Sequence, residues 1–331
     1  MSASAITAAH RSCPDLPASA RLGPSGLAIG VVRLLLCVWR ERAGSTMLLG
    51  AAILLWGANW PVMKLGLGHV SPLWLSASRF ATGAACLFAW QAMRREIRLP
   101  RRADLPVVAS IGLLQMMLFT ALGAVAMTHL PAGRSAILSY TTPIWVLPAA
   151  VLVFGERIGR QRWVGISLAG LGVLVLLNPY VIDWRDGQVL GANAMLVAAS
   201  AAWAVCILHL RYGRAPSSAI QLAPWQMLLA ATVLVPLAYA AEGPFTGDGT
   251  GVFWACLGFV GPVATAFCFC AVNAASAQLP ANATSTLMLA VPVTGLALST
   301  ATLSETLSLD LILGALAIVL GIATSARQAR A

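Results

Sequence analysis

The residues of this chain that could do chemistry are few, and most of them lie inside long apolar segments. Arg79 stands roughly two helical turns into such a segment, where a positive charge is costly and usually faces a cavity or a partner. It could bind the carboxylate of a solute, pair with neighbouring groups of the fold, or extend to the nearest polar surface. Lys64 lies only about one turn from the end of its segment, which favours the last of these roles.

Uncharged polar and aromatic side chains near the middle of the apolar segments form a second group of candidates. Asn59 offers two donors and an acceptor, which suits a zwitterionic ligand, although a hydrogen bond between helices is an equal alternative. Trp56 and Trp203 could form aromatic walls or serve in packing and anchoring. The candidates for lining a solute cavity are Trp56, Asn59, Arg79, Gln115, Tyr140, Thr141, Trp203, Gln226 and Thr265.

Catalytic and metal-binding chemistry is poorly represented in the sequence. Asp and Glu are missing from the middle of the apolar segments, and Glu156 and Glu305 stand at segment ends, where a helix cap or an ion pair is expected. The 7 cysteines are odd in number and include no C-x-x-C pair, which argues against zinc or a disulfide framework. The sequence also lacks a Walker A phosphate-binding motif. We therefore expect no enzyme activity, no cofactor and no metal site.

The elements that carry these residues are predicted to be membrane helices. Apolar types make up 59% of the 331 residues and charged types only 10%, against about 25% in soluble domains. So few charges cannot cover a water-facing surface, and so many apolar residues exclude a disordered chain. The segments that reach or approach the roughly 20 residues of a membrane-spanning helix are 47–67, 73–93, 105–127, 132–154, 163–178, 189–210, 222–241, 251–273, 281–303 and 309–325. The predicted fold class is an all-α polytopic membrane protein with ten transmembrane helices.

The net charge of +10 indicates an orientation in the membrane rather than nucleic-acid binding. All but four of the 21 basic residues fall in the N-terminal stretch, the second, fourth and sixth connections, or the C-terminus. Because Lys and Arg accumulate on the cytoplasmic side of membrane proteins, both termini are predicted to be cytoplasmic. The four exceptions are Lys64, Arg79, Arg134 and Arg185.

Residues 1–46 are predicted to form a cytoplasmic extension that is disordered or lies at the membrane surface. They contain three prolines and five arginines, and their apolar stretch is short and interrupted by Arg33. Met47 opens the first uninterrupted apolar segment. Translation could therefore begin at Met1 or at Met47.

The rest of the chain is predicted to be an internal repeat. Residues 131–175 align without gaps to 280–324, with matching Pro, Glu and Gly residues at a constant offset of 149. With a small shift Trp56 also matches Trp203, and Arg79 falls opposite Gln226. Two copies, 47–178 and 187–325, each hold five segments. Since five is odd, the second copy enters the membrane from the opposite side, as in many secondary transporters that work by alternating access. Pro143 and Pro292 occupy equivalent places and are predicted to kink their helices, with a role in gating as a further hypothesis.

Several motifs of both copies resemble a known family. They are P-A-G-R-S-A-I-L-S-Y-T-T-P at 131–143, G-E-R at 155–157, W-V-G-I-S-L-A-G-L-G-V at 163–173, S-E-T-L-S at 304–308, L-G-A-L-A-I-V-L-G at 313–321 and W-G-A-N-W-P at 56–61. In this order the motifs are similar to two EamA domains, and the chain resembles the drug/metabolite transporter superfamily over residues 47–325. The resemblance implies a ten-helix bundle around a central cavity and the transport, often export, of small metabolites such as amino acids. One departure is Leu-Ser-Glu at 303–305, where the family usually has Leu-Gly-Glu.

Together these features predict a secondary transporter that exports small polar, amino-acid-like metabolites by alternating access. The alternative is a membrane-embedded enzyme or a scaffold without transport activity, although an enzyme should show clustered His, Asp or Glu on facing segments. The expected partners are a small-molecule solute and the lipid bilayer, without nucleic acid, and the oligomeric state stays open. The expected location is the plasma membrane, which in a bacterium is the inner membrane.

Overall fold

The chain folds as a bundle of helices in a computed structural model that describes residues 24–157, 159–177, 186–213, 216–279, 284 and 287–327. Residues 1–23, half of the predicted extension, lie outside the described residues. Over the described ranges the regular elements are all helical, as predicted for an all-α protein. They are α2 (Pro24–Gly66), α3 (Pro72–Met93), η1 (Arg102–Asp104), α4 (Leu105–Ala109), η2 (Ser110–Leu118), α5 (Phe119–His129), α6 (Ala132–Ser139), α7 (Pro143–Leu152), α8 (Arg160–Leu176), α9 (Gly187–Tyr212), α10 (Ala219–Glu242), α11 (Gly251–Gly258), η3 (Phe259–Phe267), α12 (Cys268–Gln278), α14 (Ala290–Leu303) and α15 (Leu309–Arg327).

Six helical segments are long and apolar enough to cross a membrane within the described ranges, and two shorter apolar helices accompany them. The six are Gly44–Gly66, Arg102–His129, Ala132–Leu152, Gly187–Tyr212, Ala219–Glu242 and Gly251–Gln278. Large apolar side chains also point away from the bundle, for example Leu174 on α8 and Leu320 on α15. An apolar exterior of this kind is stable in lipid rather than in water, so the chain is a polytopic membrane protein.

Helix α2 differs from the predicted boundary at residue 46. It runs without interruption from Pro24 to Gly66, so the predicted extension and the first apolar segment share one helix. The junction at 40–46 contains helix-forming residues and no proline, and Gly44 alone does not end a helix. Ser45, just before the predicted boundary, donates a hydrogen bond to Gln278 at the end of α12 over 2.8 Å.

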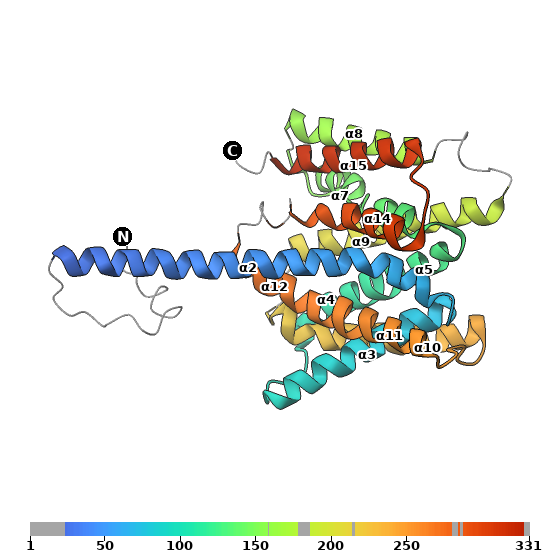
Figure 1. Cartoon of the computed structure of the whole chain (residues 1–331), viewed down its shortest axis with the longest axis horizontal. Coiled ribbons are helices and arrows are strands. Elements are labelled where there is room, and N and C mark those ends of the chain that lie inside the picture. Colours follow the sequence, from blue (N-terminus) through green and yellow to red (C-terminus); the bar gives the residue numbers. More distant parts are fainter. Residues whose placement is uncertain are drawn as a thin grey trace.

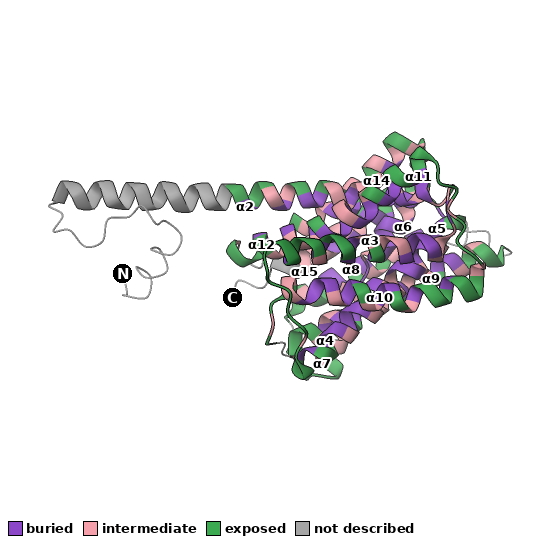
Figure 2. Ribbon diagram, turned by 90° about the horizontal axis from the view of Figure 1, so that it is seen from below, coloured by how far each residue is buried: buried purple, intermediate pink, exposed green. Residues whose placement is uncertain are grey.

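The helices of the two halves pack against each other throughout the bundle. Helix α8 lies along α15, α3 lies along α10, and α2 packs on α14 (Figure 1). The pairing of α5 with α9 joins the halves a fourth time. Buried residues follow the faces that these helices direct into the bundle, while exposed residues cover the outer faces and the ends (Figure 2).

Two π-helices stand at corresponding places in the two halves. Each bound of η3 is the corresponding bound of η2 plus 149 residues, the offset of the sequence repeat. The same relation holds between α5 and α12. Pro262 lies inside η3, but Leu113 takes its place in η2. The proline is therefore not the cause that the two π-helices share.

Glycines explain the close approach of α8 and α15. A Cβ atom on Gly165 would lie 2.5 Å from the carbonyl oxygen of Gly321, and one on Gly172 would lie 2.7 Å from that of Gly314. Small residues at such crossings let membrane helices bring their backbones together. The glycines that match between the halves of the sequence are thus the ones that meet at this interface.

The two prolines that were predicted to kink their helices lie in different local structures. Helix α6 ends at Ser139, a turn follows, and Pro143 opens α7. Thr142, directly before Pro143, keeps right-handed α backbone angles, so the turn between α6 and α7 does not arise from the restriction that a proline places on the residue before it. Pro292 is the third residue of α14, where its missing N–H would have no partner within the helix.

Candidate functional site

A cavity of about 140 Å³ lies between the helices of the two halves. Helices α2, α3, η2 and α5 of the first half meet α9, α10, η3 and α12 of the second half around it. The lining residues are Trp56, Asn59, Trp60, Met63, Arg79, Phe80, Gln115, Met116, Phe119, Thr120, Gly123, Met127, Tyr140, Trp203, Met227, Ala264, Thr265 and Phe269.

Seven of the nine candidates from the sequence line this cavity together: Trp56, Asn59, Arg79, Gln115, Tyr140, Trp203 and Thr265. Thr141 is buried elsewhere, where its hydroxyl lies 3.0 Å from that of Ser200 and donates to the carbonyl of Leu138. Gln226 lines a second cavity instead. Position in the middle of an apolar segment therefore identified most of the polar lining, but not which way each side chain faces.

Arg79 is the one charged residue among those that line the central cavity. Its Nε donates to the hydroxyl of Thr265 over 2.6 Å, and its Nη1 lies 3.1 Å from the sulfur of Met63. None of the ion pairs between described residues involves Arg79. Because sulfur is a weak acceptor and a hydroxyl is neutral, the guanidinium charge is not balanced by these partners. This arrangement is suited to an anionic ligand.

Asn59 lies beside the same sulfur atom as Arg79. Its Nδ2 is 3.3 Å from the sulfur of Met63, which brings the carboxamide and the guanidinium to one corner of the cavity. The Oδ1 of Asn59 is buried and has no hydrogen-bond partner among the described residues. An unpaired acceptor next to a cation can bind a ligand that carries a donor close to its carboxylate.

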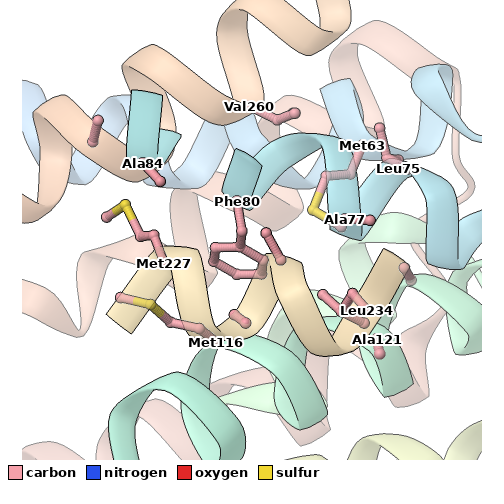
Figure 3. Close-up of a cluster of buried hydrophobic side chains, with 14 of the residues drawn as sticks. Met63, Leu75, Ala77, Phe80, Ala84, Met116, Ala121, Met227, Leu234 and Val260 are labelled. Atoms are coloured by element: carbon pink, nitrogen blue, oxygen red, sulfur yellow. The ribbon is translucent and has the colours of Figure 1, made fainter. Parts of the chain in front are cut away.

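The remaining wall of the cavity is aromatic and methionine-rich. Trp203 makes edge-to-face contacts with Phe119 and Tyr140, at ring-centroid distances of 5.1 and 5.7 Å. Phe80 from α3 lies beside Met227 of α10, and Met116 of η2 lies next to Met227 (Figure 3). Trp56 donates from its indole N–H to the carbonyl of Ala264 over 2.6 Å. Such walls bind the apolar part of a ligand and exclude water.

A second cavity of about 290 Å³ lies toward the bundle end where α9 stops and α10 begins. Gln115 and Phe269 line both cavities, so the two are neighbours. The second cavity is lined by Val107, Ile111, Gln115, Leu210, Gly213, Ser217, Ala219, Leu222, Gln226, Phe269 and Asn273. These described lining residues carry no charge.

Polar contacts at the ends of the helices fix the frame around the cavities. Glu305 accepts hydrogen bonds from the backbone amides of Ala132 and Gly133 at the start of α6, over 2.6 and 2.9 Å. Lys64 donates to the carbonyls of Met127 and Leu130 at the end of α5. It therefore binds the fold rather than extending to the surface. In the other half Glu156, the counterpart of Glu305, pairs with Arg211 at 2.7 Å.

A loop contact outside the membrane-spanning segments joins the ends of α2 and α11. The carboxylate of Asp248 accepts hydrogen bonds from the amide of Thr250 over 3.0 Å and lies 2.6 Å from Nδ1 of His69. These hydrogen bonds, that of the Thr250 amide first, hold the pKa of Asp248 below its usual range.

Several lining residues were not among the sequence candidates. Most are apolar, such as Met63 and Phe269, and cannot be told from packing residues in a membrane helix. Thr120 is polar and follows Met116 by four residues, so a helical-face argument from Gln115 and Met116 could have found it. Asn273 is the last residue of the predicted apolar segment 251–273 but lies in the middle of α12, so the predicted boundary hid it.

Comparisons with known proteins match this architecture. The sequence profile of the EamA-like transporter family matches twice, over residues 42–178 and 190–327. An uncharacterized transporter of Bacillus subtilis, YoaV, is 25% identical over 81% of this chain and 92% of its own. A probable amino-acid metabolite efflux pump of Salmonella typhimurium is 27% identical over 82% of this chain and 90% of its own. One solved crystal structure has the same fold, with a TM-score of 0.60 and 21% identity over 87% of this chain and 97% of that chain. The resemblance found in the motifs is confirmed, and the chain belongs to the EamA-like transporter family.

Proposed function

We propose that this protein is a secondary transporter that exports small amino-acid-like metabolites with a carboxylate group. The observation that carries the proposal is Arg79, a cation that lines the cavity between the halves and has only Thr265 and Met63 as hydrogen-bonding partners among the described residues. A buried charge of this kind is stabilised by a ligand of opposite charge. The carboxylate of a solute supplies it.

The position of Asn59 beside Arg79 supports an amino-acid-like solute. The carboxamide of Asn59, whose oxygen has no hydrogen-bond partner among the described residues, shares the sulfur of Met63 with the guanidinium of Arg79, as the ammonium and carboxylate of an amino acid lie near each other. The aromatic and methionine side chains around Trp203 then pack against the rest of the solute. The relative from Salmonella typhimurium that is named as an amino-acid metabolite efflux pump points to the same solute class.

The transport mechanism we propose is alternating access between two inverted repeats of five spans each. The recurrence of η2 as η3 after 149 residues and the pairing of α8 with α15 support two equivalent halves. With ten spans both termini would lie on one side of the membrane, and the distribution of basic residues supports the cytoplasmic side. Rocking one half against the other would expose the cavity to each side in turn. A relative from Escherichia coli that is named as an inner membrane transporter, 28% identical over 48% of this chain, supports a location in the inner membrane of a bacterium.

Export from membrane vesicles tests this function. Purified full-length protein is reconstituted into liposomes loaded with a panel of amino acids, and counterflow of each labelled amino acid is measured. We expect counterflow of at least one member of the panel, and a loss of more than tenfold in Arg79→Ala at equal protein abundance, the effect of losing about one charged hydrogen bond. Arg79→Lys, which keeps the charge but not the planar fork, should retain part of the activity. Equal counterflow by Arg79→Ala and the native protein would falsify the role of Arg79.

A further inference from the structure

Arg79 and Gln226 occupy matching places in the two halves. A Cβ atom on Gly261 of η3 would lie 3.0 Å from the backbone carbonyl of Arg79, and one on Gly112 of η2 would lie 3.0 Å from that of Gln226. The two glycines are themselves 149 residues apart, at the same position of their π-helices. Each half therefore presents one long polar side chain next to a π-helix, a cation in the first half and a carboxamide in the second.

The surroundings of the two side chains differ. Arg79 donates a hydrogen bond to the hydroxyl of Thr265. The residue of the first half that corresponds to Thr265 is Met116, which has no hydroxyl that could bind Gln226 in the same way. Gln226 is fully buried, and neither its Nε2 nor its Oε1 has a hydrogen-bond partner among the described residues. A buried carboxamide that leaves both groups unpaired is costly, because buried polar groups in folded proteins are nearly always hydrogen-bonded.

The second cavity gives these unpaired groups a place to bind a ligand. Gln226, Gln115 and Asn273 line it together. Asn273 donates one N–H of its carboxamide to the carbonyl of Phe269 over 2.8 Å, which leaves its second N–H and its oxygen. Because the described residues that line it carry no charge, they offer no counter-charge to an ionised group. A neutral group that both donates and accepts, such as a carboxamide or a hydroxyl, fits this set of side chains.

We propose that the second cavity is a subsite for the uncharged polar end of the transported solute, with Gln226 as its main specificity-determining residue. The subsite continues the central cavity past Gln115 and Phe269, which line both. It rests on the proposed function, because Arg79 holds the carboxylate of the same solute. The two sites together select a solute with a carboxylate at one end and a neutral hydrogen-bonding group at the other.

The test compares two solutes that share a headgroup and differ at the far end. Counterflow of labelled L-glutamine and L-methionine, which have side chains of similar length, is measured in liposomes for the native protein and Gln226→Leu. Removing the carboxamide should lower the ratio of glutamine to methionine transport about tenfold, the effect of roughly one hydrogen bond. Gln226→Asn, which keeps a carboxamide on a shorter stem, should restore part of the ratio.

Gln91→Leu serves as the matched control. Gln91 is another buried glutamine between α3 and α10, where it donates to the carbonyl of Ile220, and it lines neither cavity. This variant should keep the native ratio even if its total transport falls. An unchanged ratio in Gln226→Leu, or the same change in Gln91→Leu, overturns the subsite. If a full panel of amino acids gives no counterflow with the native protein, the proposed function itself fails, and the subsite falls with it.

Discussion

The guanidinium of Arg79 and the hydroxyl of Thr265 form a hydrogen bond of 2.6 Å that joins the first half of the chain to the second. Thr265 is prepared for this contact by its own helix. Its hydroxyl donates to the carbonyl of Val260 over 2.7 Å, five residues earlier in the π-helix, so its lone pairs face the arginine. The orientation of the cation in the cavity thus depends on two uncharged side chains, Thr265 and Met63.

Replacing Thr265 should therefore weaken solute binding without removing the charge. In Thr265→Val the shape is kept and the acceptor is lost, and we expect the KM for export to rise about five- to tenfold, as for the loss of one hydrogen bond. Thr265→Ser keeps the hydroxyl and should behave like the native protein. The check is the concentration dependence of counterflow, and equal KM values for the two variants would argue against the role of Thr265.

The crossing of α8 and α15 should tolerate no side chain at its glycines. In Gly165→Ala the new methyl group would meet the backbone of α15 at 2.5 Å, so the helices must separate. We expect a loss of about 1–3 kcal/mol of stability, as for other overpacked sites. Gly170→Ala on the same helix has open space around it and should be neutral. Thermal unfolding in detergent compares the two, and similar midpoints would contradict the close approach.

Glu305 should contribute more to stability than its counterpart Glu156. Glu305 caps α6 by binding two backbone amides, and its amide variant Glu305→Gln replaces one acceptor with a donor that opposes an N–H group. We expect a cost of about 1–2 kcal/mol. The pair of Glu156 with Arg211 is partly exposed, and Glu156→Gln should cost less than about 1 kcal/mol. Parallel thermal unfolding of the two variants decides, and an equal effect would show that the cap is not important.

Ser304 should be a site of backbone strain. Its φ of 53° lies in the left-handed region, and Gly155, 149 residues earlier, has a φ of 67°. The serine in the Leu-Ser-Glu departure thus stands where glycine is favoured. Ser304→Gly is expected to stabilise the protein by about 0.5–1 kcal/mol, and Gly155→Ser to destabilise it by a similar amount. Opposite shifts of the unfolding midpoint are the expected result, and shifts of the same sign would rule out this explanation.

Acid should weaken the contact of the Asp248 loop. The pKa of Asp248 is lowered in the folded protein by the amide of Thr250 and by His69, so its contribution to stability is present above the usual carboxyl pKa of about 3.9. That contribution is lost as the pH falls through the lower folded-state value. Thermal unfolding between pH 5 and 3, a range set by that pKa of about 4, should decline more steeply for the native protein than for Asp248→Asn. Parallel curves would show that the contact contributes nothing to stability.

The sequence predicted the kind of fold and most of the polar cavity, since both follow from local patterns. The apolar segments, the doubled motifs and the cost of Arg79 in an apolar environment can all be read along the chain. The contact between Arg79 and Thr265 could not, although both were candidates, because it depends on how two helices far apart in sequence are rotated. The sequence also could not predict that Thr265 lines the central cavity and Gln226 the second one, for the same reason. The sequence analysis also placed a boundary at residue 46, whereas α2 continues through it because no helix-breaking residue stands there.

The matching π-helices also indicate when these wide turns arose relative to the divergence of the two halves. A π-helix has i→i+5 hydrogen bonds and is rare in proteins. A change that widened a helix after the two halves had separated would affect only one of them. Because the bounds of η2 and η3 differ by the same 149 residues as the sequence repeat, we infer that the wide turns were present before the two halves diverged. Gly112 and Gly261 would then be descendants of one glycine, and the change that made Arg79 and Gln226 different came later.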